Sequence, residues 1–388
     1  LVVGIVVPTI SSAKLKKSGV LYRREFASFN AYFLDSIKGI KDIVLNNAEE
    51  EREAEVNRRS DILLKETKRM KYGITRAGAA TELVVSLFIL ITLAAGAAVL
   101  LPVRIYQLFA IIDTGSTGFY KKIDFSVYFM YVAVVVFTAL LIVFSRLSDD
   151  TRASRPAMCK NKLLGAAAVV MAVGTAYDSA DSMLSFSASC SDFSSNLDVS
   201  FMRYFFSNGM FASLFESIFG IIACVYFIVF ALSYFNDKAD FTSYKVLALA
   251  PLFWAMCKMI TRFMTKISFI NVSELMLEML ELALVMLFFM SFAKISSDVA
   301  DKGEFKKLVS YGMPAAMLAA VIGVSRLVIT LCGKRDRLPS ELGFSVTDPA
   351  FAFFAIVYIR HQMKHGRPES EDNAPSEDET AAKADKIN

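Results

Sequence analysis

A series of long apolar blocks constrains this chain more than any other feature of its sequence. A helix needs about 20 apolar residues to cross the hydrocarbon core of a bilayer, which is roughly 30 Å thick. Mean hydropathy is +0.47, and the apolar residues are gathered in blocks rather than spread along the chain. The sequence therefore predicts an all-α, polytopic membrane helical bundle. Its spans are expected at residues 83–101, 126–145, 163–184, 211–234, 246–260, 274–293, 311–332 and, in the shortest block, 346–359.

A polar stretch over residues 13–76 precedes these blocks and follows residues 1–12, which resemble the end of another span. The stretch has no proline and consists largely of helix formers, with 15 Lys and Arg against 10 Asp and Glu between residues 14 and 76. At 1.5 Å per residue it is long enough for two helical arms of roughly 45 Å each. Gly39 and the pair Asn46–Asn47 are the residues least suited to a helix interior. We expect a helical hairpin that bends there, and its basic excess predicts a cytoplasmic location.

Lysine and arginine in the later loops give an orientation. With the arms in the cytoplasm, the basic loop 146–162 lies on the same side, and the Ser-rich loop 185–210, whose single basic residue is Arg203, lies outside. This agrees with the positive-inside rule. Segments 258–266 and 333–340 would also lie outside and carry three basic residues each, which goes against the rule. We expect the chain to lie in a cell membrane and to cross it several times. Its compact loops favour a bacterial inner membrane.

Several kinds of chemistry find no support in the sequence. A net charge of +4 is too small to indicate a nucleic-acid partner. The five cysteines are far apart and lack the spacing of a disulfide framework or zinc site. His361 and His365 share one helix face without a third ligand, so neither a metal site nor a catalytic residue is expected. Residues 366–388 carry seven acidic and three basic residues and no aromatic one, which is typical of a disordered acidic tail.

One segment carries a resemblance to a known family. Residues 24–96 contain an aromatic-rich descending stretch followed by DSIKGIKDI (Asp35–Ile43). NNAEEE (Asn46–Glu51), a charged ascending stretch and AGAA (Ala77–Ala80) come next. This order resembles the transmembrane domain of ABC exporters over the fourth span, the second intracellular loop and the fifth span, and covers roughly residues 1–101.

The resemblance implies a coupling helix at the tip of the hairpin, which docks in a groove of an ATPase domain. Exposed apolar residues in this region need such a partner, whereas a plain charged coiled-coil hairpin would need none. The implied partners are an ABC ATPase domain or subunit, a second permease half and the lipid bilayer. The implied contact residues are Ile43, Val44, Leu45, Asn46, Asn47, Ala48, Glu49, Glu50 and Glu51.

The chain also departs from that family. An exporter permease has six spans, and the first three have no counterpart here. The phosphate-binding pattern G-x-x-x-x-G-K-[ST] is missing, and its nearest match, Cys332–Arg335, lacks the first glycine and the hydroxyl residue. We therefore expect no enzyme activity and no cofactor in this chain, with ATP and Mg²⁺ held by a partner. Residues 102–365 form a separate bundle of about seven spans and unknown role, so a fusion or assembly chimera with a join near residues 97–104 is an open alternative.

Three glutamates mark a second candidate site, within a predicted span. Glu274, Glu278 and Glu281 are four and three residues apart, which places them on one helical face about 10 Å long. Ionisable residues in spans are costly and usually functional. The stripe predicts a proton or cation pathway with some carboxyls protonated because like charges repel. Lys258, Arg262 and Arg326 are candidate counter-charges. The alternative places the stripe near the membrane surface, against a polar groove or basic neighbours.

Three functions follow from these features. The first is an ABC exporter-type permease fragment coupled to an ATPase in trans. The second is a membrane scaffold or signalling protein whose arms bind a partner. The third is an ion-coupled secondary transporter that uses the glutamate stripe.

Overall fold

The computed structural model describes residues 2–112, 120–147, 159–195, 200–207, 209–236, 245–264, 272–301, 303–332 and 344–365. Within these ranges it leaves out the side chains of residues 2–15, 17, 77–78, 80–81, 194–195, 207 and 272–275. The predicted tail, 366–388, lies outside the described residues. The side chains of the span predicted at residues 1–12 also lie outside the described part of the chain.

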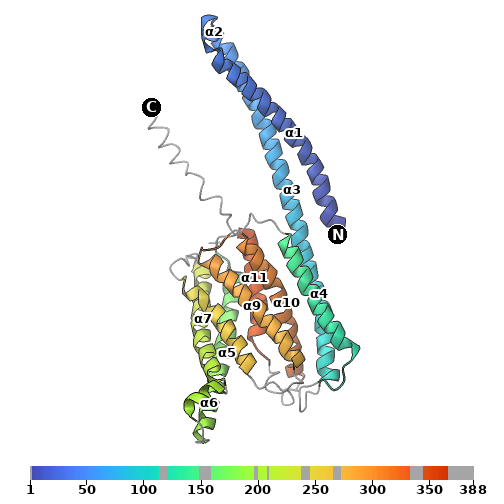
Figure 1. The fold of residues 1–388 in the computed structure, drawn as a ribbon, viewed down its shortest axis with the longest axis vertical. Coiled ribbons are helices and arrows are strands. Elements are labelled where there is room, and N and C mark those ends of the chain that lie inside the picture. The colour runs from blue at the N-terminus through green and yellow to red at the C-terminus, as the bar shows by residue number, and fades with distance from the viewer. Residues whose placement is uncertain are drawn as a thin grey trace. The chain divides into compact units, whose positions relative to one another are not determined.

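The described residues are helical almost throughout, which confirms an all-α polytopic bundle (Figure 1). Besides the helices they contain an isolated bridge between Ile112 and Tyr120. The α-helices are α1 (Val2–Lys38), α2 (Ile40–Leu45), α3 (Glu49–Tyr106), α4 (Phe125–Arg146), α5 (Lys162–Ser195), α6 (Phe201–Ser207), α7 (Met210–Asn236), α8 (Ala250–Met264), α9 (Val272–Ser296), α10 (Glu304–Leu331) and α11 (Thr347–His365). A π-helical turn, Gln107–Ile111, extends α3, and a 3₁₀ turn, Leu247–Leu249, precedes α8.

Seven of the described helical segments are long and apolar enough to cross a membrane. Each coincides with a block predicted from the sequence, since in hydrocarbon a helix satisfies its backbone hydrogen bonds internally. They are Glu82–Ile111, Phe125–Arg146, Lys162–Phe193, Met210–Asn236, Leu247–Met264, Met276–Ser296 and Glu304–Leu331. The eighth block, 346–359, forms part of α11, which is not among these seven. Residues such as Phe351, Phe354 and Tyr358 of α11 are buried in the bundle instead.

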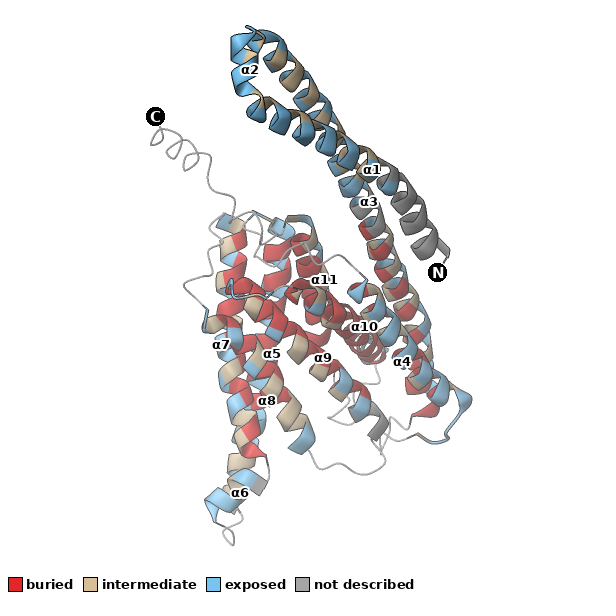
Figure 2. Ribbon diagram, turned by 45° about the horizontal axis from the view of Figure 1, so that its top comes forward, coloured by how far each residue is buried: buried red, intermediate tan, exposed pale blue. Residues whose placement is uncertain are grey.

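The chain divides into two compact units, Leu1–Phe88 and Ile89–Asn388, and α3 contributes residues to both. In the first unit α1 and α3 form a hairpin with the short helix α2 between them (Figure 1). Exposed and half-buried residues cover most of this hairpin (Figure 2). Its helices therefore gain little from an apolar core, and other contacts must hold them together.

The second unit is a closely packed bundle with a core of aromatic rings. Helix α5 packs along α7 and α11, α7 packs on α8, and α10 packs on α9, α11 and α4. Ring centroids of Phe292 and Tyr358 lie 4.8 Å apart, and those of Phe227 and Phe354 lie 5.3 Å apart, both edge-on. Buried residues fill the inside of this unit (Figure 2). The rigid core fixes the positions of the polar side chains between the helices.

Helix α10 meets the start of α11 at Gly323. A Cβ atom placed on Gly323 would lie 2.7 Å from Cδ of Pro349 and 3.2 Å from Cβ of Asp348. Contacts under 3.0 Å do not occur between real Cβ atoms and their neighbours, so only glycine allows this approach. The close crossing brings Asp348 to the same part of the bundle as Arg326, which lies one turn further along α10.

Replacing this glycine tests the crossing. Gly323→Ala forces the start of α11 away from α10, and overpacking of this kind costs about 1–3 kcal/mol. We expect a lower midpoint of thermal unfolding for the purified protein in detergent. Gly19→Ala is the control, because its Cβ would have nothing within 4 Å. That change is expected to leave the midpoint unchanged or raise it, since alanine favours a helix over glycine. Equal midpoints for Gly323→Ala and wild type would contradict the crossing.

Candidate functional site

The tip of the hairpin is a bend built from a short helix between two turns. Helix α1 ends at Lys38, Gly39 leads into α2, and α2 ends before Asn46 and Asn47. Asn47 has a φ of +50°, a left-handed conformation that asparagine adopts more readily than most residues. Helix α3 then begins with Glu49–Glu51, whose negative charges suit the positive end of a helix dipole. The tip therefore has a defined shape.

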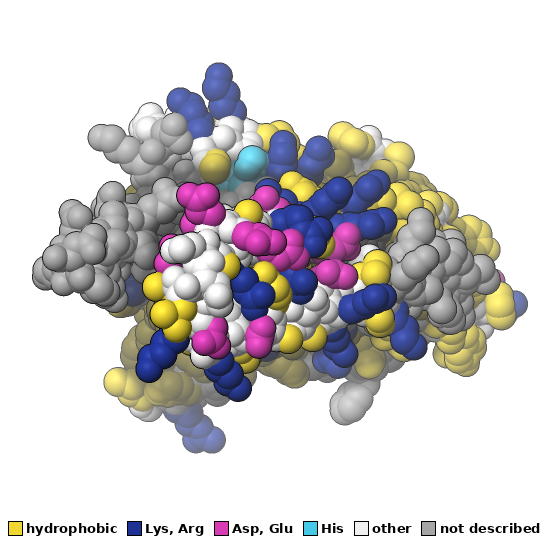
Figure 3. Space-filling view, turned by 90° about the horizontal axis from the view of Figure 1, so that it is seen from above, with side chains coloured by type: hydrophobic (Ala, Val, Ile, Leu, Met, Phe, Trp, Pro, Cys, Tyr) yellow, Lys and Arg dark blue, Asp and Glu magenta, His cyan; other side chains and the backbone are white. Residues whose placement is uncertain are grey.

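Apolar side chains project into solvent at this tip. Leu45 is 80% exposed, Ile40 59% and Val44 53%, and Ile37 at the end of α1 is also exposed. Acidic and basic side chains surround hydrophobic ones in the view onto this end of the hairpin (Figure 3). An apolar group rimmed by charges is typical of a surface that another protein covers. We refer to Ile37, Ile40, Val44 and Leu45 as the tip patch.

A charged latch joins the two arms next to the tip patch. The guanidinium groups of Arg52 and Arg59 on α3 lie 4.0 and 4.1 Å from the ring centroid of Tyr32 on α1. Arg52 also donates to Asp35 Oδ2 at 2.7 Å and to Ser36 Oγ at 2.9 Å. Such cation–π contacts contribute about 0.5–1 kcal/mol each at exposed sites. The latch joins the end of α1 to the start of α3, on either side of α2 in the sequence.

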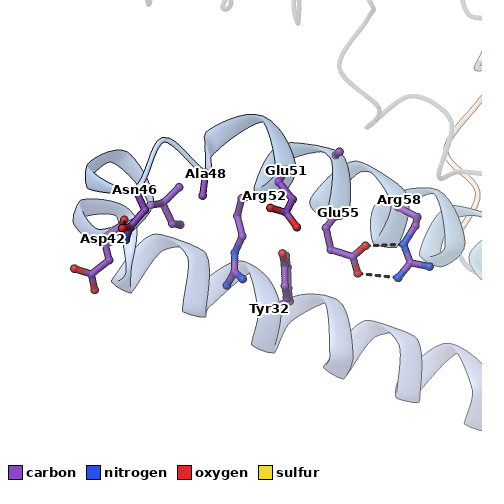
Figure 4. Close-up of a pocket in the computed structure, with 10 residues that line it drawn as sticks. Tyr32, Asp42, Asn46, Ala48, Glu51, Arg52, Glu55 and Arg58 are labelled. Atoms are coloured by element: carbon purple, nitrogen blue, oxygen red, sulfur yellow. Dashed lines mark hydrogen bonds and ion pairs between the residues drawn. The ribbon is translucent and has the colours of Figure 1, made fainter.

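Glu55 orients Arg59 of the latch and the neighbouring Arg58. Its carboxylate accepts hydrogen bonds from Arg58 at 2.6 and 2.7 Å (Figure 4). It also accepts one from Arg59 at 2.7 Å. Hydrogen bonds from Arg58 and then Arg59 lower the pKa of Glu55 to about 2. Glu55 and Arg58 border an open groove of about 660 Å³ between the arms. The groove is lined by Tyr32, Asp42, Ile43, Asn46, Ala48, Glu51, Arg52, Ala54, Glu55 and Arg58.

A second polar group lies inside the bundle, where charged side chains of five helices meet. Glu278 on α9 accepts a hydrogen bond from Arg326 on α10, and Nε of Arg262 on α8 lies 3.5 Å from its other oxygen. Lys258 on α8 pairs with Asp178 on α5. Buried charges in a membrane bundle are tolerated when they pair with one another. These ion pairs tie α5, α8, α9 and α10 together.

A small cavity lies among these charges. Its volume is about 10 Å³, and it is lined by Lys258, Arg262, Glu278, Glu281, Leu282, Arg326, Ser345 and Asp348. A cavity needs roughly 10–15 Å³ to hold one water molecule. The space therefore admits about one water molecule and is too narrow for a hydrated ion.

Two of the three predicted glutamates lie at this cavity. Glu278 and Glu281 are buried and line the cavity, whereas the side chain of Glu274 lies outside the described residues. Of the proposed counter-charges, Arg262 and Arg326 contact Glu278, and Lys258 pairs with Asp178.

Asp348 and Arg104 are among the residues of this region to which the sequence assigned no role. Asp348 and Arg104 are both buried. Arg104 Nη1 donates to Gln107 Oε1 at 3.0 Å. Asp348 could have been found as an ionisable residue inside the apolar block 346–359. Arg104 follows the predicted span 83–101 directly, and nothing in its sequence context distinguishes it from a residue at the membrane surface.

The low pKa of Glu55 predicts a pH dependence for the hairpin. The folded pKa of about 2 lies below the ordinary value of 4.5, so the ion pairs stabilise the folded arms fully above about pH 4.5. That contribution is lost as the pH falls towards 2. We expect Glu55→Gln to lower thermal stability at pH 7, with a difference from wild type that shrinks between pH 4.5 and pH 2. Circular dichroism at 222 nm measures it, with the exposed Glu53→Gln as the control. A difference that does not change with pH would contradict the prediction.

The buried pair of Lys258 and Asp178 predicts that the effects of replacing these two residues on stability are strongly non-additive. Lys258→Met leaves Asp178 as a buried charge that has lost its partner, which costs about 3–5 kcal/mol. We expect the double variant Lys258→Met/Asp178→Asn to regain most of that loss in thermal unfolding. Arg69→Met is the control, since Arg69 is exposed and 3.7 Å from Glu66, a pair worth about 0–1 kcal/mol. Additive losses in the double variant would show that the pair does not act as a unit.

Comparisons with known proteins give a similarity over part of the chain. No protein-family model matches the chain, and no solved structure matches it. A probable ABC transporter ATP-binding/permease protein of Haemophilus influenzae is 32% identical to it over 96 residues. These residues are 25% of this chain and 17% of that protein. The chain is thus a multi-pass membrane protein with a short stretch of similarity to an ABC transporter.

Proposed function

We propose that residues 1–101 act as a permease segment of an ABC exporter-type transporter and that the hairpin tip couples it to an ATPase on a partner. The observation that carries this proposal is the tip patch, an exposed apolar surface on a bend held by the latch. The similarity over 96 residues to a protein described as an ATP-binding/permease protein supports it.

The energetics of the tip favour a partner. Fully burying an aliphatic side chain contributes about 1.5–3 kcal/mol, and Leu45, Val44 and Ile40 are each more than half exposed. A hairpin that stayed alone in water would gain nothing from these residues. A preformed bend also loses little conformational freedom on docking, which preserves more of the binding energy. The acidic start of α3, Glu49–Glu51, adds a negative rim that suits a partner groove with basic edges.

The chemistry would be divided between two proteins. The partner would bind ATP and Mg²⁺ and hydrolyse ATP, while residues 43–51 of this chain would transmit its movement through α1 and α3. The latch gives the tip and the arms a fixed connection through which a displacement can pass. A second permease half would complete the transport pathway.

The buried charges of the second unit favour a second candidate, an ion-coupled secondary transporter. Carboxyl and basic groups of several helices meet around one cavity, as expected of a site where an ion or proton is held between helices. The hairpin tip and the buried charges lie in different units of the chain, so the two candidates are tested separately.

Site-specific photocrosslinking tests the coupling proposal. A benzoylphenylalanine residue is placed at Val44 in the full-length chain, crosslinked in native membranes, and the adducts are identified by mass spectrometry. The control position is Leu64, which is 52% exposed on the arm of α3. We expect Val44 adducts to contain a protein with the motif G-x-x-x-x-G-K-[ST], and Leu64 adducts to lack it. Adding Leu45→Glu should reduce the yield at Val44 at least about tenfold, which corresponds to 1.4 kcal/mol of lost affinity.

Other outcomes would overturn this function. Adducts with a protein that lacks the ATPase motif would indicate a scaffold or signalling role for the arms. Equal yields of the ATPase at Val44 and Leu64 would show contact without docking at the tip. The same holds if Leu45→Glu leaves the yield at Val44 unchanged.

A further inference from the structure

The buried charges of the bundle are not balanced. Among the described residues of this region, carboxyl groups come from α5, α7, α9 and α11, and basic groups come from α3, α8 and α10. The acids are Asp178, Glu216, Glu278, Glu281 and Asp348, and the bases are Arg104, Lys258, Arg262 and Arg326. The acids outnumber the bases, and every acid is at least nine-tenths buried. Because an uncompensated charge is unfavourable in such surroundings, the excess carboxyls must be neutralised.

The ion pairs show which carboxyls are already compensated. Glu278 is held between Arg326 and Arg262, and Asp178 is held by Lys258 with Ser345 Oγ 3.4 Å from its other oxygen. Arg104 on α3 has an electrostatic interaction with Arg326. Its Nη1 donates a hydrogen bond to Gln107 Oε1 at 3.0 Å. Lys258, Arg262 and Arg326 are therefore engaged with Glu278 or Asp178, and Arg104 is engaged with Gln107. The carboxyl groups in excess of these ion pairs are those of Glu216, Glu281 and Asp348.

Glu281 and Asp348 face the same cavity. Glu281 is 4% exposed and lines the cavity together with Asp348, which is 9% exposed. Within the described part of the chain no ion pair reaches Glu281. Of the neighbouring charged groups, Asp348 has the strongest electrostatic interaction with Glu281, and Lys258 has the next strongest. Two carboxylates at one cavity of this size repel each other with little water to screen them.

Glu216 stands apart from this pair. It is 5% exposed and does not line the cavity, and its Oε2 has no hydrogen-bond partner in the described structure. The charges that act on it are those of Lys258 and Asp178. Glu216 therefore does not share the cavity of Glu281 and Asp348.

We propose that Glu281 and Asp348 form a proton-binding site and hold a single proton between them. One carboxyl is then the acid and the other the carboxylate, so the pair carries one negative charge rather than two. The proton comes from water, and the only bond made or broken is an O–H bond. A metal cation is the less suitable occupant, because Ca²⁺ takes six or more oxygen ligands and Mg²⁺ usually keeps several waters. The cavity, at about 10 Å³, leaves no room for them.

Infrared difference spectroscopy tests the site directly. The full-length protein is placed in lipid nanodiscs, and the C=O stretch of protonated carboxyl groups is recorded in H₂O and D₂O from pH 5 to pH 10. We expect wild type to show a protonated carboxyl band at pH 7. That band should disappear in Glu281→Gln and also in Asp348→Asn, because either change leaves a lone carboxylate close to basic groups. Loss in both single variants distinguishes a shared proton from a proton on one independent acid.

Controls assign the remaining signals. Glu216→Gln should leave this band in place, as should Asp181→Asn, which alters an exposed carboxyl on α5. Because Glu216 is itself an excess acid, the decisive spectra are recorded in the Glu216→Gln background. A protonated carboxyl band that persists there after Asp348→Asn or Glu281→Gln overturns the proposal of a shared proton. A shift of the band when KCl replaces choline chloride would show a cation site instead. If a variant at Glu281 or Asp348 does not fold, the spectrum of Glu216→Gln decides: the absence of any protonated carboxyl band at pH 7 overturns the site.

Discussion

Charges buried where water is scarce impose the constraint on which the second unit depends. A lone carboxylate or guanidinium there is unfavourable by several kcal/mol, so each charge must be paired or hydrogen-bonded, or a carboxylate must take up a proton. Glu278 meets Arg326 and Arg262, and Lys258 meets Asp178. These contacts require α5, α8, α9 and α10 to pack in one register. The aromatic core supplies most of the packing, and the ion pairs select the arrangement.

The hairpin of the first unit shows the opposite situation. Its side chains are largely exposed, so its two arms are held by surface contacts of modest strength, in which Tyr32, Arg52 and Arg59 take part. Exposed ion pairs and cation–π contacts each contribute about 1 kcal/mol or less. A bent tip with Leu45 80% exposed thus completes its packing only when another surface covers it. The weak internal packing of the hairpin and its proposed coupling to a partner have one cause, the exposure of its side chains.

Much of the fold was predictable from local sequence, and much of the site was not. Seven apolar blocks became helices suited to a membrane, because block length and hydropathy are properties of neighbouring residues. The turns at Gly39 and Asn47 follow from single residues with unusual backbone preferences. Spacing placed Glu278 and Glu281 on one helix, but it gave no sign that arginines hold Glu278 while Glu281 faces Asp348. Asp348 had no role in the sequence analysis, since it comes from a different helix 67 residues later.

By itself, the sequence determined that this is a helical protein of many spans, with a charged hairpin and acidic residues inside its spans. These properties depend on hydropathy and residue spacing along one helix. Tertiary structure alone decided which acids have partners. The close crossing at Gly323 brings Asp348 of α11 to the cavity where Glu281 of α9 lies. Whether a buried carboxyl is an ion-pair partner or a proton acceptor depends on distances between helices. Those distances are set by how side chains fill the core.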